Sequence, residues 1–232
     1  MTSAVGLFNS TNLGLPQPWT PAKEPLPLII YGASSAVGAY AVQLATRSNI
    51  HPLICVAGKS TKYVESLIDT SKGDVVIDYQ QGEDGTIAAI RKAAGGNKLL
   101  YAYDAISEKG SYHLLGKALD AGAKITTVLP VREKDAIPDY VEHSPTHVGS
   151  VHGNKSSYMV NMSDEREFGY IYFRYFAKGL QDGWFKPLPQ VVVPGGINGI
   201  QEGLKNLKEG KAHGNKFVFR IVDESGFEGS KI

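Results

Sequence analysis

From residue 28 to residue 129, short apolar runs alternate with longer segments in which apolar residues recur every three to four positions. The short runs predict buried strands at Leu28–Tyr31, Leu53–Ala57, Val75–Asp78, 99–104 and 124–129. The longer segments predict helices at 39–46, 62–69, 86–94 and 112–119. Apolar strands separated by helices form a parallel sheet that is covered on both faces. The pattern therefore predicts an α/β fold of three layers with a doubly wound, mostly parallel sheet.

The flanking segments follow other patterns. Residues 1–25 carry four prolines around Trp19, so any helix there should end before Gly14 and lead into an extended arm. Beyond Pro130 we predict a strand near 148–151, a helix at 165–181, strands at 188–193 and 217–222, and a short helix at 200–207. The predicted organisation is an arm at 1–25, one domain at 26–222 and a tail at 223–232.

The helix at 165–181 carries an aromatic stripe at helical spacing. Its members are Phe168, Ile171, Tyr172, Tyr175 and Phe176. We interpret this stripe as facing the core, with a ligand wall as the alternative.

Composition narrows the classes of partner. Hydrophobic residues make up 42% of the chain and charged residues 20%, which suits a globular core, and 24 basic against 23 acidic side chains create no field that attracts nucleic acid. The single cysteine, Cys55, can form neither an internal disulfide nor a thiolate zinc site. We find no basic signal region before Lys23 and no apolar run of the roughly 18 residues that a membrane helix needs. We expect a cytoplasmic protein with no metal site and with neither nucleic acid nor membrane as partner.

The strongest local signal is a run of small residues between the first strand and its helix. Small residues let the backbone approach a pyrophosphate, and the amino end of the helix supplies free N–H groups and partial positive charge. Alanine and serine stand where G-x-G-x-x-G has its middle glycine, so the strand and helix on either side carry the interpretation. The alternative is a turn with a purely structural role. The run consists of Gly32, Ala33, Ser34, Ser35, Ala36, Val37 and Gly38.

The choice of nucleotide depends on an absence of acids. An NAD-binding fold places an Asp or Glu about 20 residues after the turn, yet residues 33–64 contain neither. The second strand is instead followed by Lys59, Ser60 and Tyr63, whose ammonium and hydroxyl groups suit a ribose 2′-phosphate. The pattern favours NADPH over NADH, with an ordinary solvated loop as the alternative.

Two further positions follow strands whose carboxyl ends should border the ligand crevice. Asp104 ends the fourth predicted strand, and Leu129 lies at the end of the fifth. Asp104 has the chemistry to contact a ribose or to act as a base, but we favour a role in capping a turn.

Other functions remain open at this stage. Residues 32–36 loosely match a nucleophile elbow, and Ser34, Asp104 and His113 follow the chain order of a hydrolase triad. This alternative is a hydrolase of a small ester, epoxide or haloalkane, with Asp104 as the nucleophile in the last two cases. A third candidate is a module that binds NADPH without catalysis.

Residues 28–45, LIIYGASSAVGAYAVQLA, resemble the cofactor domain of the medium-chain dehydrogenase/reductase superfamily, especially zinc-free quinone oxidoreductases and fungal trans-acting enoyl reductases. Residues 13–16, 75–79, 104–107 and 214–218 add to the resemblance, which covers nearly the whole chain. It implies a Rossmann-like domain and an NADPH-dependent oxidoreductase that reduces a quinone or an activated carbon–carbon double bond.

The resemblance also implies roles for individual residues. Gly32 to Gly38 would lie at the pyrophosphate, Lys59, Ser60 and Tyr63 at the 2′-phosphate, and Ile106 and Leu129 at the adenine and nicotinamide ends. A homodimer would pair an edge strand near Gln190–Val193.

One departure from the family bears on catalysis. Members carry an amino-terminal catalytic domain that forms one wall of the substrate cleft, and this sequence begins about where that domain would end. We therefore expect a cofactor-binding domain. Its substrate site is either shallow or closed by a dimer mate, or else the domain serves another function.

Overall fold

The computed structural model describes residues 1–132, 137–152 and 165–221. The chain divides into two compact units, Met1–Lys186 and a second that begins at Pro187. No helix in the described ranges is long and apolar enough to cross a membrane.

The first unit is built on a six-stranded sheet in the order β3-β2-β1-β4-β5-β6, in which every neighbouring pair is parallel. The strands are β1 (Leu28–Tyr31), β2 (Leu53–Ala57), β3 (Val75–Asp78), β4 (Tyr101–Asp104), β5 (Lys124–Thr127) and β6 (Glu142–Pro145). Since the chain passes from β3 on one side of β1 to β4 on the other, the strand order reverses between β1 and β4. The predicted α/β fold with a doubly wound parallel sheet is confirmed, and β1, β2 and β3 have the predicted bounds.

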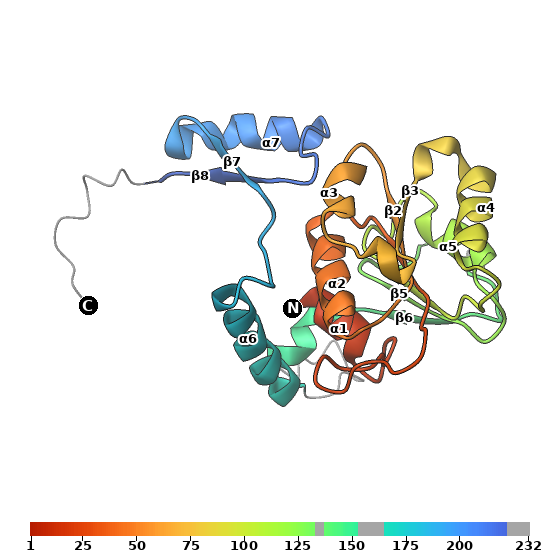
Figure 1. The fold of residues 1–232 in the computed structure, drawn as a ribbon. Helices are drawn as coiled ribbons and strands as arrows, with labels where there is room; N and C mark the ends of the chain where they lie inside the picture. The colour runs from red at the N-terminus through yellow and green to blue at the C-terminus, as the bar shows by residue number, and fades with distance from the viewer. Residues whose placement is uncertain (133–136, 153–164, 222–232) are drawn as a thin grey trace. The chain divides into compact units, whose positions relative to one another are not determined.

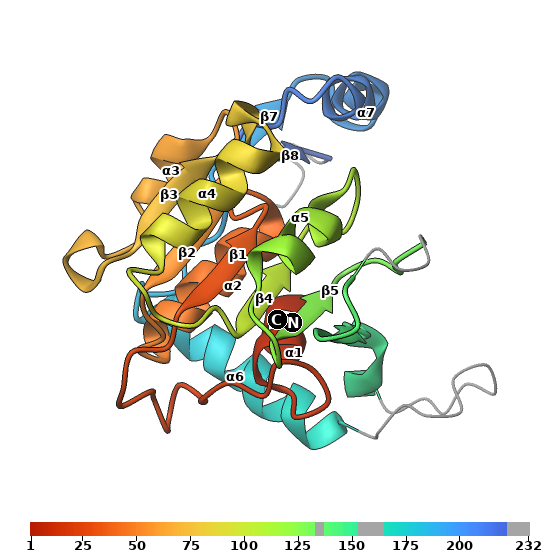
Figure 2. The same cartoon turned by 90° about the vertical axis from the view of Figure 1, so that its right-hand side faces the viewer.

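Helices cover both faces of this sheet (Figures 1 and 2). They are α1 (Thr2–Phe8), α2 (Ala36–Arg47), α3 (Thr61–Glu65), α4 (Glu83–Ala93), α5 (Ser111–Ala118) and α6 (Arg166–Gln181), with 3-10 helices η1 (Thr70–Lys72), η2 (Tyr79–Gln81) and η3 (Val148–His152). Alternate residues of β1 face opposite layers: Leu28 and Ile30 pack in a core with residues of α1, α2 and α6, and Ile29 packs with residues of α4 and α5. Such burial on both faces is why the strands are apolar throughout.

The amino-terminal segment packs into the fold. The helix α1 ends before Gly14, as predicted, and its residues Ser3–Phe8 are buried. The chain beyond it contributes Leu13 and Leu15 to the same core as α2, and the side-chain amide of Asn12 donates to Thr126 Oγ1 over 3.1 Å. The boundaries predicted for an arm, a domain and a tail stay a prediction.

The strand predicted near 148–151 is wrong. These residues form η3, and the strand on this side of the sheet is β6, which the hydrophobic pattern missed. Within the described part of the chain β6 pairs only with β5, so it is an edge strand there, and its Glu142 and His143 are exposed. A solvent-facing edge strand needs no apolar run, so periodicity cannot detect it.

The aromatic stripe of α6 faces the core at four of its five predicted positions. Tyr172 and Phe176 are buried, and Phe168 and Tyr175 pack against them in part. Ile171 is 47% exposed, so the core prediction is wrong for that residue.

The second unit is a β-α-β element. Its strands β7 (Gln190–Val193) and β8 (Lys216–Phe219) are parallel, and η4 (Gly196–Gly199) and α7 (Ile200–Lys208) connect them. The helix packs closely on the sheet at Gly203, where an added Cβ would lie 2.4 Å from the Phe219 ring. The predicted tail at 223–232 lies outside the described residues.

Candidate nucleotide-binding site

The turn after β1 has a backbone that only glycine adopts readily. Gly32 has a φ of 74°, in the left-handed region. Its amide and that of Ala33 both donate to the carbonyl of Val56 in β2, over 2.9 and 3.0 Å. A Cβ on Gly32 would lie 2.4 Å from Ile106 Cγ1. The turn is therefore tied to one neighbouring strand and covered by the loop that follows another.

Gly38 permits a close approach between helix and turn. A Cβ at this position would lie 2.2 Å from the carbonyl oxygen of Gly32 and 2.8 Å from Ala33 Cα. Both contacts are with backbone, which cannot rotate away as a side chain can. This contact holds the amino end of α2 close to the turn that follows β1.

The first turn of α2 offers unused hydrogen-bond donors. Ser35 is the N-cap, and its Oγ accepts from the amide of Gly38 over 3.0 Å. The amides of Ser34, Ala36 and Val37 take part in no hydrogen bond among the described residues. The first turn of α2 also contains no acidic residue. Free amides and the positive end of a helix dipole make this turn suitable for a phosphate group.

The predicted 2′-phosphate residues lie at the carboxyl end of β2. Lys59 is exposed and forms no ion pair in the described part of the chain. Ser60 is the N-cap of α3, yet its hydroxyl makes no capping bond. Burial raises the pKa of the partly exposed Tyr63, and nearby Tyr40 adds to this effect, so the phenol remains a hydrogen-bond donor. All three groups are available to a ligand.

Sequence reasoning missed Tyr79 as a member of this site. Tyr79 follows β3, and a Cβ on Gly58 would lie 2.8 Å from its ring, so the tyrosine covers the backbone just before Lys59. Its ring stacks on Tyr31 with centroids 6.1 Å apart, and it remains 45% exposed. The available signal was topological, because β2 and β3 are parallel neighbours whose carboxyl ends share one edge of the sheet.

Asp104 caps the turn after β4. Its carboxylate is completely buried and accepts hydrogen bonds from the amides of Ile106 and Ser107 and from the hydroxyl of Ser111. Burial raises the pKa of this carboxyl, and the three donors oppose that rise. The geometry agrees with the favoured capping role.

The remaining predicted residues are more dispersed. Leu129 follows β5 and is 42% exposed, and β4 lies between β5 and β1. His113 lies on α5 and is partly exposed. None of the hydrogen bonds described for Asp104 involves His113 or Ser34, so the hydrolase alternative gains no support from the geometry.

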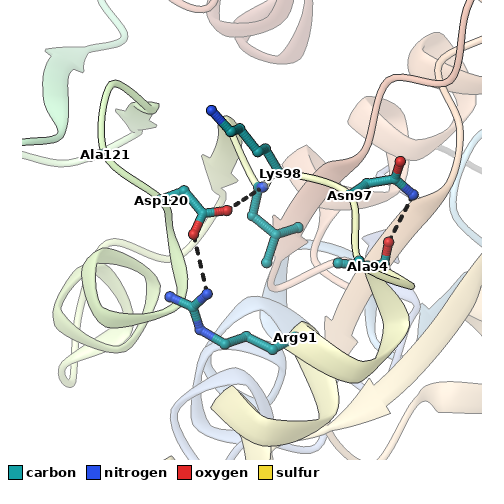
Figure 3. A pocket seen from close by; sticks show the side chains of 8 residues that line it. Arg91, Ala94, Asn97, Lys98, Asp120 and Ala121 are labelled. Carbon is teal, nitrogen blue, oxygen red and sulfur yellow. Dashed lines mark hydrogen bonds and ion pairs between the residues drawn. The ribbon is translucent and has the colours of Figure 1, made fainter.

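A cavity of about 450 Å³ lies at the end of the sheet where the strands begin, beside the residues that precede β4 (Figure 3). Two of its charged groups, Arg91 and Asp120, serve the fold. Asp120 accepts from the amide of Leu99 over 2.8 Å and pairs with Arg91 over 3.2 Å, and Arg91 also donates to the carbonyls of Lys117 and Leu119. These bonds tie the ends of α4 and α5 together, and we assign the cavity no ligand.

Comparison with known proteins finds fungal trans-enoyl reductases among the relatives. No protein-family model matches the chain. The trans-enoyl reductase fsr4 of Gibberella fujikuroi is 45% identical over 199 residues, which is 85% of this chain and 56% of that protein. A second trans-enoyl reductase of the same fungus is 31% identical over 230 residues, or 95% of this chain and 62% of that protein. The chain thus spans about three fifths of the length of these relatives.

Solved structures share the fold at low sequence identity. The CurK enoyl reductase superposes with a TM-score of 0.67 at 16% identity, covering 93% of this chain and 58% of that one. CurA from Vibrio vulnificus, solved in complex with NADPH, superposes with a TM-score of 0.62 at 16% identity, covering 96% of this chain and 62% of that one. The resemblance indicated by the sequence is confirmed: the chain is a homologue of the fungal trans-enoyl reductases over the part of their length that it spans, with a Rossmann-like α/β fold.

Proposed function

We propose that this chain binds NADPH at the turn between β1 and α2. The observation that carries the proposal is the group of three free amides at Ser34, Ala36 and Val37, held at a helix terminus by the close contact between Gly38 and Gly32. Such a terminus suits a pyrophosphate. Support also comes from CurA, a structural neighbour solved with NADPH.

The residues at the end of β2 make NADPH the preferred nucleotide. Lys59, Ser60 and Tyr63 would hold the 2′-phosphate, since they offer a cation and two hydroxyl donors with no described partner. Tyr79 would form a wall of the same pocket, because it covers Gly58 and keeps an exposed ring face. Ile106 would cover the turn from the side of β4.

The reaction we propose is reduction of an activated carbon–carbon double bond or a quinone. When bound, NADPH supplies the hydride, and this chain would orient the nucleotide and exclude water from it. The proposal rests on the trans-enoyl reductase relatives, which this chain covers in part. The proposal also includes a cytoplasmic location and a homodimer that forms through the edge strand β7. In the described sheet, β7 has β8 as its neighbour.

The test is a titration of the protein with NADPH and NADH, followed by thermal stability and nucleotide fluorescence. A ligand that binds the native state raises the melting temperature. We expect Lys59→Ala with Tyr63→Phe to weaken NADPH about tenfold or more, because charge-assisted hydrogen bonds are lost, and to leave NADH nearly unchanged. Lys92→Ala, which removes an exposed lysine from α4, is the matched control. Equal losses for both nucleotides would remove the 2′-phosphate assignment.

Turnover distinguishes a reductase from a binding module. The protein with NADPH is offered a quinone and an α,β-unsaturated thioester, and nucleotide oxidation is followed by absorbance. Consumption of NADPH that depends on the acceptor supports the reductase. Tight NADPH binding without consumption would support the non-catalytic module, and no binding would overturn the proposed function.

A further inference from the structure

The loop between β4 and α5, residues 105–110, covers the glycine turn. The amide of Ala105 donates to the carbonyl of Tyr31 at the end of β1 over 3.0 Å. The next residue, Ile106, fills the space beside Gly32, where its Cγ1 lies 2.4 Å from the position of an added Cβ. The loop therefore lies where the strand order reverses, at the position that ligands occupy in sheets of this kind.

One buried carboxylate holds this loop at both of its ends. Asp104 Oδ1 accepts from the amides of Ile106 and Ser107, over 3.0 and 2.8 Å. Asp104 Oδ2 accepts from Ser111 Oγ, in the first residue of α5, over 2.6 Å. Because Asp104 has no exposed surface, its carboxylate cannot touch a ligand, and any effect on binding must pass through the loop.

The backbone of the loop is strained. Ser107 and Lys109, neither of them glycine, have φ values of 56° and 55°. Ser107 is fixed from two sides, since its Oγ donates to the carbonyl of Asp104 over 3.0 Å and accepts from the amide of Val128 over 2.9 Å. Residues in the left-handed region persist where the surroundings over-determine them, and such sites are frequent at ligand clamps.

We propose that Asp104 is a positioning residue for the nucleotide: it holds loop 105–110 in the ligand-ready conformation, with Ile106 against the Gly32 turn. The proposal rests on the proposed NADPH site. A loop that is ordered before binding costs the ligand no ordering entropy. Removal of the carboxylate would leave the loop in the competent conformation for only a fraction of the time, and affinity would fall by that fraction.

The experiment measures NADPH affinity and amide hydrogen exchange in the same variants of the full chain. We expect Asp104→Ala to weaken NADPH about tenfold, which corresponds to a loop that is competent one tenth of the time. Exchange should rise in residues 105–110 and stay unchanged in β1 and β2. Asp104→Asn should restore most of the affinity, because its side-chain oxygen can still accept from both amides, and Ser111→Ala should give an intermediate loss.

The matched control is Asp120→Ala. Asp120 also accepts from a backbone amide, that of Leu99, but at the opposite edge of the sheet (Figure 3). Its loss should lower stability and leave NADPH affinity unchanged. If Asp104→Ala does not fold, Ser111→Ala provides the same readouts, with Asp104→Asn as the variant expected to stay near the wild type.

The outcomes separate this inference from the proposed function. If the wild-type protein binds no NADPH, the proposed function fails and the inference fails with it. If the wild type binds NADPH and Asp104→Ala or Ser111→Ala binds it within twofold of wild type, the positioning role is wrong and the nucleotide site stands. Exchange that rises throughout the sheet, with affinity lost equally in Asp120→Ala, would show a general structural role and would also overturn the inference.

Discussion

Gly38→Ala tests whether the close contact between α2 and the turn creates the nucleotide site. The added Cβ would lie 2.2 Å from the carbonyl oxygen of Gly32 and 2.8 Å from Ala33 Cα. Because ordinary contacts between heavy atoms are about 3.5 Å or longer, helix and turn must separate by roughly 1 Å. Overpacking of this kind costs about 1–3 kcal/mol, and the higher helix propensity of alanine returns up to about 1 kcal/mol. We expect a net loss near 1–2 kcal/mol, or a melting temperature lowered by about 2–8 °C.

The same displacement should damage phosphate binding more than it damages the fold. The free amides of Ala36 and Val37 move with the helix, whereas Ile106 and the turn remain tied to the strands. Loss of one hydrogen bond to a charged group costs about 1.5–3 kcal/mol, which weakens binding by at least about tenfold. The assay is thermal denaturation of the free protein together with an NADPH titration well below the melting temperature.

Gly85→Ala in α4 is the control for this prediction. An added Cβ there would meet Gln81 Cγ at 3.1 Å, which is the middle of a flexible and exposed side chain. Helix propensity should dominate, so we expect unchanged or higher stability and unchanged NADPH affinity. The reasoning is refuted if Gly38→Ala matches Gly85→Ala in both melting temperature and affinity.

Three further substitutions test other parts of the structure. Burial raises the pKa of Asp104 above its ordinary value of 3.8, so the wild type loses stability as pH rises from 3.8 through the folded-state pKa. In a pH series, the unfolding free energy of Asp104→Asn relative to wild type should therefore increase over that range. A difference that does not change with pH would contradict the assignment of a buried charge. Arg91→Ala removes the pair with Asp120 and two bonds to the end of α5, and should cost about 1 kcal/mol in chemical denaturation with no change in NADPH affinity. Gly203→Ala would place a Cβ 2.4 Å from the Phe219 ring, so we expect faster limited proteolysis after residue 187. An unchanged proteolysis pattern would contradict this prediction.

The central strands could be predicted from sequence because burial on both faces requires them to be apolar throughout. Leu28–Tyr31, Leu53–Ala57 and Val75–Asp78 were found with their observed bounds for this reason. The edge strand Glu142–Pro145 has polar residues and one neighbour among the described strands, so it carries no such signal. The helix Thr2–Phe8 is buried along nearly its whole length, so it lacks the polar face on which amphipathic periodicity depends.

In the candidate site, too, the parts fixed by local sequence could be predicted and the parts fixed by strand order could not. Local backbone requirements made the Gly32 turn and its α2 terminus visible in the sequence, because a left-handed φ and a close helix contact both demand glycine. The parts contributed by other strands were not visible. Tyr79 and Ile106 join the site only because β3 and β4 occupy particular places in the strand order, which one sequence does not specify; Tyr79 was missed, and Ile106 was named only through the family resemblance. The capping role of Asp104 could be favoured from sequence, because its three donors lie within seven residues along the chain. The position of its loop over Gly32 could not, because that contact joins segments far apart in the sequence.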